Sequence, residues 1–111
     1  MSTICAISTA PGTGGIAVIR VSGPEAIPFT ERVFHPRNPK KQLSLCAANS
    51  LTYGQAFDKQ GTLIDEVVAA LFRAPHSFTG EDTVELSCHG SQFIQQPLLQ
   101  ALIDAGCRLA E

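Results

Sequence analysis

A glycine-rich turn and three polar side chains are the parts of this sequence whose types and spacing could do chemistry. The turn is Pro11-Gly12-Thr13-Gly14-Gly15, and it leads directly into the apolar segment Ile16–Gly23, which contains Arg20. Glu85 and His89 lie in a second such segment. A guanidinium suits carboxylates or the carbonyls of a heterocycle, and a carboxylate accepts two adjacent N–H donors of an amidine-like ring edge. These residues therefore point to ligand binding.

The glycine-rich turn first raises the question of phosphate binding. Gly12-x-Gly14-x-x-Ala17 fits the loose dinucleotide-binding pattern, which requires a helix whose N-terminus faces the phosphates. The residues that follow, Ile16-Ala-Val-Ile-Arg-Val, are instead typical of a strand, and no G-x-x-x-x-G-K-[ST] motif occurs. The segment is thus a strand–turn–strand unit. A plain hairpin turn remains possible, although three glycines favour a ligand or partner chain nearby.

Arg20 and Glu85 allow two interpretations. They could hold a ligand between them, or they could form a cross-strand ion pair without a ligand. His89 could act as a base or a metal ligand, but adjacent strand residues point to opposite faces, so His89 and Cys88 would not converge on one ion. We find no complete catalytic constellation and no metal site, and we expect binding rather than catalysis by this chain.

The elements that must position these residues follow from the hydrophobic periodicity. We expect strands over 3–9, 16–22, 49–57, 65–72 and 83–88, helices over about 24–34 and 91–105, and the start of another strand over 107–110. Residues 35–44 and 74–82 are predicted loops. The order predicts one α+β domain, with a mixed, mostly antiparallel sheet and helices on one face.

The second predicted helix carries two further expectations. Pro97 predicts a kink, or a helix that starts nearer Gln95, and Gly106 is the expected C-cap. Helical spacing predicts that its buried face consists of Phe93, Ile94, Leu98, Ala101, Leu102 and Ala105.

Composition limits the possible functions. The 111 residues carry eight Lys and Arg and a formal net charge of −2, and the densest basic group, Arg37 to Lys41, could not hold RNA alone. There is no signal peptide and no apolar run long enough for a membrane span, so we expect a cytoplasmic protein. Cys5, Cys88 and Cys107 have apolar neighbours and are predicted core residues. The chain stops just after an apolar run, and we expect a fragment of a longer protein.

Two long segments resemble one known family. They are Ala6-Ile-Ser-Thr-Ala-Pro-Gly-Thr-Gly-Gly-Ile-Ala-Val-Ile-Arg-Val-Ser-Gly and Ser77-Phe-Thr-Gly-Glu-Asp-Thr-Val-Glu-Leu-Ser-Cys-His-Gly. In this order and at this spacing they are similar to the N-terminal domain of the tRNA-modification GTPases called MnmE or TrmE. The resemblance extends to the final Ala105-Gly-Cys-Arg-Leu-Ala-Glu.

The resemblance implies a fold similar to the folate-binding domain of aminomethyltransferases, and a homodimer that binds 5-formyltetrahydrofolate or a related tetrahydrofolate. It places the folate contacts on Arg20 and Glu85, with Gly14, Gly15 and His89 close by. It also implies that the full-length protein has GTP, Mg²⁺ and K⁺ sites outside this chain. That protein would act with the flavoprotein MnmG (GidA) to build an aminomethyl or carboxymethylaminomethyl group on the wobble uridine of tRNA.

The sequence departs from the family pattern at two motifs, and one family residue lies outside it. Thr13 stands where an arginine is common, and His89-Gly90-Ser91-Gln92 replaces His-Gly-Gly-Pro. A family lysine that helps to hold folate lies beyond Glu111. Two other functions stay open: a dimerisation scaffold without folate, and a fragment of a folate-dependent aminomethyltransferase.

Overall fold

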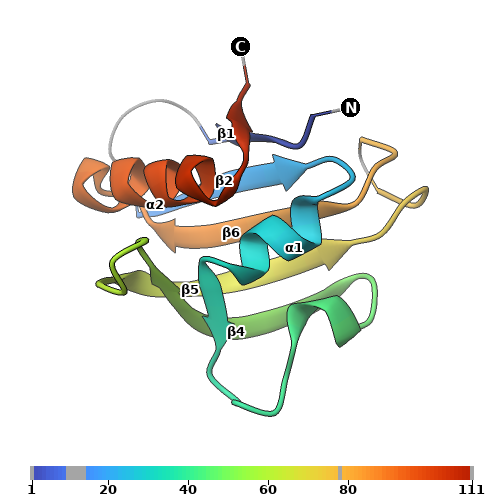
Figure 1. The fold of residues 1–111 in the computed structure, drawn as a ribbon, viewed down its shortest axis with the longest axis horizontal. Coiled ribbons are helices and arrows are strands. Elements are labelled where there is room, and N and C mark those ends of the chain that lie inside the picture. Colours follow the sequence, from blue (N-terminus) through green and yellow to red (C-terminus); the bar gives the residue numbers. More distant parts are fainter. Residues whose placement is uncertain (1, 10–14, 78, 111) are drawn as a thin grey trace.

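The computed structural model describes residues 2–9, 15–77 and 79–110. Within these residues one sheet of seven strands carries two helices on one of its faces (Figure 1). The helices are α1 (Ala26–Glu31) and α2 (Gln92–Ala105). The strands are β1 (Ile4–Ile7), β2 (Ile16–Ser22), β3 (Phe34–Pro36), β4 (Ser50–Phe57), β5 (Leu63–Phe72), β6 (Thr83–His89) and β7 (Arg108–Leu109). The predicted α+β class is confirmed.

The strand order is β3-β4-β5-β6-β2-β1-β7, and every neighbouring pair is antiparallel except β1 and β7. The β4–β5 hairpin turns at Asp58, whose carboxylate accepts hydrogen bonds from the backbone N–H groups of Gln60 and Thr62, each at 2.9 Å. Gly61 follows with a φ of 84°, a conformation that glycine adopts without a steric penalty. These residues form the tight turn that joins β4 to β5.

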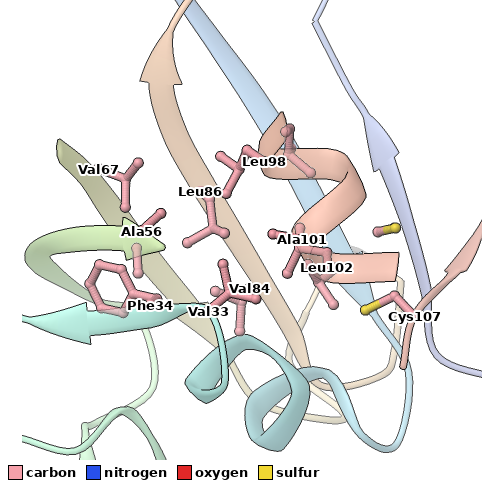
Figure 2. Close-up of a cluster of buried hydrophobic side chains, with 14 of the residues drawn as sticks. Val33, Phe34, Ala56, Val67, Val84, Leu86, Leu98, Ala101, Leu102 and Cys107 are labelled. Atoms are coloured by element: carbon pink, nitrogen blue, oxygen red, sulfur yellow. The ribbon is translucent and has the colours of Figure 1, made fainter. Parts of the chain in front are cut away.

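The core lies between the helices and the sheet face that they cover (Figure 2). Alternate strand residues such as Ile19, Leu86 and Leu71 point to this face, and Leu98 and Leu102 of α2 pack against them; all five are at most 1% exposed. Cys5, Cys88 and Cys107 are also buried here, as predicted. No helix of the described residues covers the opposite face of the sheet. The alternate strand residues on that face can therefore contact a ligand or another protein surface.

Helix α2 corrects the predicted buried face. Ser91 caps the helix by accepting a hydrogen bond from the Phe93 N–H at 3.1 Å, so the helix begins at Gln92 and not near Gln95. This placement leaves Phe93 89% exposed and buries Gln95 at 2%, where its amide donates to the Gly90 carbonyl oxygen at 2.7 Å. The other predicted residues face the core or pack against it, and Gly106 caps the helix.

The region after α1 differs from the predicted loop. Pro28 falls within the first turn of a helix of only six residues, where a missing N–H costs nothing, and the helix ends before residue 34. Strand β3 and a 3₁₀ turn at Leu43–Leu45 then occupy part of the predicted loop over 35–44. In the described part of the chain, neither α1 nor α2 is long and apolar enough to cross a membrane.

Candidate functional site

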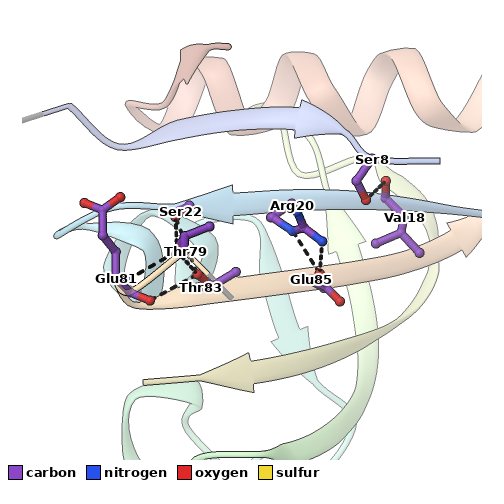
Figure 3. A network of polar contacts seen from close by, with 8 residues as sticks. All are labelled: Ser8, Val18, Arg20, Ser22, Thr79, Glu81, Thr83 and Glu85. Atoms are coloured by element: carbon purple, nitrogen blue, oxygen red, sulfur yellow. Dashed lines mark hydrogen bonds and ion pairs between the residues drawn. The ribbon is translucent and has the colours of Figure 1, made fainter. Parts of the chain in front are cut away.

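Arg20 and Glu85 stand directly opposite each other on β2 and β6. The Arg20 guanidinium donates from Nε to Glu85 Oε2 at 2.9 Å, and its Nη2 lies 2.7 Å from the same oxygen (Figure 3). The two side chains are 32% and 27% exposed. Sequence reasoning therefore identified two residues that the fold brings into contact, and the predicted cross-strand pair exists. Because both contacts use Oε2, the second carboxylate oxygen lies outside this ion pair.

The pair lies on the sheet face that the helices leave open. Its cross-strand neighbours are Ala6 on β1 and Ala70 on β5, and the next positions along the open face include Val18 and Val68. These four side chains are half-buried. These side chains do not cover the charged pair, which is 32% and 27% exposed, so a polar ligand edge could reach it from the open face.

A cluster of hydroxyl groups lies beside the pair, at the end of β2. Ser22 Oγ and Thr79 Oγ1 are 2.9 Å apart, and Thr79 Oγ1 and Thr83 Oγ1 are 3.0 Å apart (Figure 3). Thr83 also donates to the backbone carbonyl oxygen of Glu81 at 3.1 Å. This network ties Thr79 and Glu81 to the neighbouring ends of β2 and β6. Sequence reasoning missed it, although three hydroxyl residues within Ser77–Thr83 gave a signal.

His89 forms a second polar pair, on the same face of β6 as Glu85. Its Nδ1 lies 2.8 Å from Asp65 Oδ2, and its backbone N–H donates to the same oxygen at 2.9 Å. Partial burial opposes ionisation of Asp65, but the hydrogen bonds from His89, a backbone hydrogen bond from Glu66 and the charge of His89 together lower the pKa of the carboxyl. Sequence reasoning did not predict Asp65, because only the sheet register brings it to His89.

The two predicted glycine contacts have different outcomes. Gly14 lies outside the described residues. Gly15 accepts a hydrogen bond from the Gly90 N–H at 3.3 Å, which places it next to His89 as predicted. Arg20 and Glu85 therefore lie at the middle of the β2–β6 strand pair and His89 at its end, where Gly15 immediately precedes β2.

Cys88 and His89 point to opposite sides of the sheet: Cys88 is 4% exposed and belongs to the core, whereas His89 is exposed. Burial, together with the Asp65 charge, raises the pKa of the Cys88 thiol to about 11, so this cysteine is a poor nucleophile at neutral pH. Among the described residues, no three His, Cys, Asp or Glu side chains are grouped so that they could hold a metal ion.

The fold and the site define an α+β domain whose uncovered sheet face carries a partly exposed charged pair, with an alanine on each side of it and a hydroxyl cluster at the strand end. The family described as the GTP-binding protein TrmE N-terminus matches residues 3–111, and the chain belongs to this family.

Three relatives show the extent of the likeness, and each is named tRNA modification GTPase MnmE. The relative from Parabacteroides distasonis is 62% identical over 111 residues, which cover 100% of this chain and 24% of the relative. The relative from Bacteroides thetaiotaomicron is 53% identical over 98% of this chain and 23% of its own length. The relative from Symbiobacterium thermophilum is 45% identical over 98% of this chain and 24% of its own length. The chain thus spans about a quarter of the length of these relatives.

Proposed function

We propose that this chain binds a tetrahydrofolate, such as 5-formyltetrahydrofolate, and forms the dimerising N-terminal domain of a tRNA-modifying GTPase. The observation that carries the proposal is the Arg20–Glu85 pair, about one-third exposed on the open sheet face. The contacts from Arg20 Nε and Nη2 both end on Glu85 Oε2, so Oε1 lies outside the ion pair, on a partly exposed side chain that a ligand could reach.

The donor set suits a pterin. The Glu85 carboxylate only accepts hydrogen bonds, and its Oε1 can accept from the adjacent ring N–H and amino groups of a pterin. The Arg20 guanidinium would hold Glu85 ionised and oriented, and would donate to a ring carbonyl or a carboxylate of the ligand. Half-buried side chains such as Val18 and Val68 would contact the flat faces of the ring. When bound, the folate would supply a one-carbon unit, and the domain's part is to orient it and exclude water.

Dimerisation is supported by the apolar side chains on the same face. Ile16 and Leu51 are 69% and 70% exposed, on strands at different positions across the sheet. Exposed apolar residues on a face without a covering helix favour association with another surface. A second copy of this chain would cover them.

The remaining steps belong to the full-length protein. We propose that it is cytoplasmic and hydrolyses GTP with Mg²⁺ and K⁺ bound outside this chain. We further propose that it works with the flavoprotein MnmG (GidA) on the wobble uridine of tRNA. The names of the relatives support the tRNA and GTPase parts. With a net charge of −2, this domain would leave most of the grip on the tRNA to other parts of the complex.

A scaffold without folate is the second candidate function. It is favoured by one observation: Arg20 and Glu85 already satisfy each other at 2.7 Å. Calorimetric titration of the 111-residue chain with 5-formyltetrahydrofolate, together with sedimentation, separates the two functions. Folate binding that Glu85→Gln weakens supports the first function. A folded dimer that gives no binding heat overturns it and leaves the scaffold.

A further inference from the structure

A hollow beside β3 and β4 is built from residues outside the Arg20–Glu85 site. Its volume is about 530 Å³, and its lining includes His35, Arg37, Tyr53, Gln55, Phe57 and Glu66. We call it the ring hollow. Tyr53, Gln55 and Phe57 alternate along β4, so all three point to one face of the sheet, and His35 joins them because it is paired with Gln55.

The walls of the ring hollow are flat groups. The His35 and Phe57 rings contact each other, with centroids 5.3 Å apart and planes tilted by 56°. The Arg37 guanidinium lies over the Tyr53 ring, 5.8 Å from its centroid. Aromatic rings and arginine planes are the groups on which proteins stack planar heterocycles, including unstacked nucleic-acid bases.

Two polar side chains that line the ring hollow could read a hydrogen-bonding edge. Gln55 and Glu66 stand opposite each other on β4 and β5. The Glu66 carboxylate raises the pKa of the Tyr53 phenol, and both side chains are exposed to solvent. A carboxylate accepts only, whereas the Gln55 amide both donates and accepts. Glu66 and Gln55 together therefore suit a heterocycle with adjacent N–H donors next to a carbonyl.

A second hollow shares the Arg37–Tyr53 wall and differs in charge. Its volume is about 360 Å³, and it is lined by Arg37, Asn38, Lys41, Thr52 and Tyr53. We call it the cation hollow, because its described lining residues include two cations and no carboxylate. The Lys41 N–H donates to the Asn38 carbonyl oxygen at 3.0 Å, and the Arg37 N–H donates to the Tyr53 carbonyl oxygen at 3.0 Å. These bonds fix the backbone that carries both cations.

We propose that the two hollows together bind one nucleotide with a guanine-type edge. The base would stack in the ring hollow and donate its N–H groups to Glu66, and its phosphate would lie in the cation hollow at Arg37 and Lys41. Adenine presents an amino donor beside a ring acceptor, so a carboxylate there disfavours it. A free guanine nucleotide and a guanosine in single-stranded RNA share this chemistry. The site uses none of the residues proposed for folate, so it does not rest on that proposal.

The single tyrosine of the chain is a reporter built into the site. The sequence has one Tyr and no Trp, so the Tyr53 ring resonances are assigned without ambiguity by NMR. We would titrate the 111-residue chain with GMP, with AMP, and with the pentaribonucleotides UUGUU and UUAUU. We expect shifts of the Tyr53 ring that saturate at least five-fold earlier for the guanine ligand of each pair. If UUGUU binds tenfold more tightly than GMP, RNA is the source; equal binding points to the free nucleotide.

Variants test the role of each wall. Tyr53→Ala should weaken binding about 5- to 150-fold, which is the range for loss of one stacked base. Because this variant lacks the tyrosine signal, its binding is followed by the NMR shift of the Arg37 backbone amide. Tyr53→Phe keeps the ring and should retain binding even if Tyr53→Ala folds poorly. Glu66→Gln should abolish the preference for guanine. Arg37→Ala should reduce the slope of the logarithm of the binding constant against the logarithm of the salt concentration by about one. Lys59→Ala, at an exposed cation in the β4–β5 turn, is the matched control.

Two results would overturn the inference. One is the absence of any Tyr53 shift with millimolar GMP and UUGUU. The other is binding that Lys59→Ala weakens as much as Arg37→Ala does, which would indicate unspecific attraction to charge. Folate binding by Tyr53→Phe and Glu66→Gln is measured in parallel. Folate binding that these variants leave unchanged shows that a loss of nucleotide binding belongs to this site and not to the proposed folate site.

Discussion

Replacing Glu85 and Arg20 separately and together should change the stability of the fold very little. The proposed cycle is Glu85→Gln, Arg20→Gln and the double variant. The side chains are 32% and 27% exposed, and both guanidinium contacts end on one oxygen and do not form two parallel bonds. Pairs of this kind contribute about 0.2–1 kcal/mol, so we expect a coupling free energy of about 1 kcal/mol or less.

Urea denaturation followed by circular dichroism measures that coupling. Glu25→Gln and Arg108→Gln, both at exposed positions, are the matched controls. A coupling above about 3 kcal/mol would refute the reasoning, because it would mean that the pair behaves as a buried structural ion pair. A small coupling has a useful consequence: any loss of ligand binding by Glu85→Gln then reports on the ligand contact and not on unfolding.

Three further predictions concern the fold around the site. Leu102→Ala, at a fully buried position of α2, should lower the free energy of unfolding by about 2–5 kcal/mol. The control Gln100→Ala, at an exposed position of the same helix, should lower it by less than about 0.5 kcal/mol. Urea titration measures both values. Folding lowers the pKa of Asp65, so this carboxylate stabilises the fold at pH values above its pKa in the unfolded chain, about 3.9. That stabilisation is lost as the pH falls through the pKa of Asp65 in the folded protein. Asp65→Asn should therefore reduce the fall in the free energy of unfolding between neutral and acidic pH. An unchanged pH dependence would contradict the lowered pKa of Asp65. Finally, a maleimide at pH 8 should label Cys46 first, with the three core thiols reacting only after unfolding, as mass spectrometry would record.

The main features of the site were predictable because they depend on strand alternation. Arg20 and Glu85 each interrupt an apolar strand, and a polar residue at such a position has to face away from the core. That constraint by itself assigns both side chains to the same face of the sheet. The sheet register then makes them direct partners, which the sequence alone suggested but could not distinguish from a ligand-separated pair.

The features that were missed depend on contacts between distant segments. Asp65 meets His89 only because β5 and β6 are neighbours, and a sequence pattern does not encode that distance. Strand β3 is three residues long and contains Pro36, so its composition resembles a loop, and its pairing with β4 decides its structure. Phe93 was assigned to the core because its spacing fits a helix face. The Ser91 cap sets where the helix begins, and Gln95 takes the buried position.

We propose that the open sheet face binds a reduced folate at the Arg20–Glu85 pair. Isothermal titration of 5-formyltetrahydrofolate into the 111-residue chain tests it most directly, with the Glu85→Gln variant and the Glu25→Gln control alongside. We predict saturable binding by the wild type and by the control. The Glu85→Gln variant should bind at least tenfold more weakly, while its urea midpoint stays close to that of the wild type. Absence of binding by the folded wild-type chain, or equal binding by all three proteins, would contradict the claim.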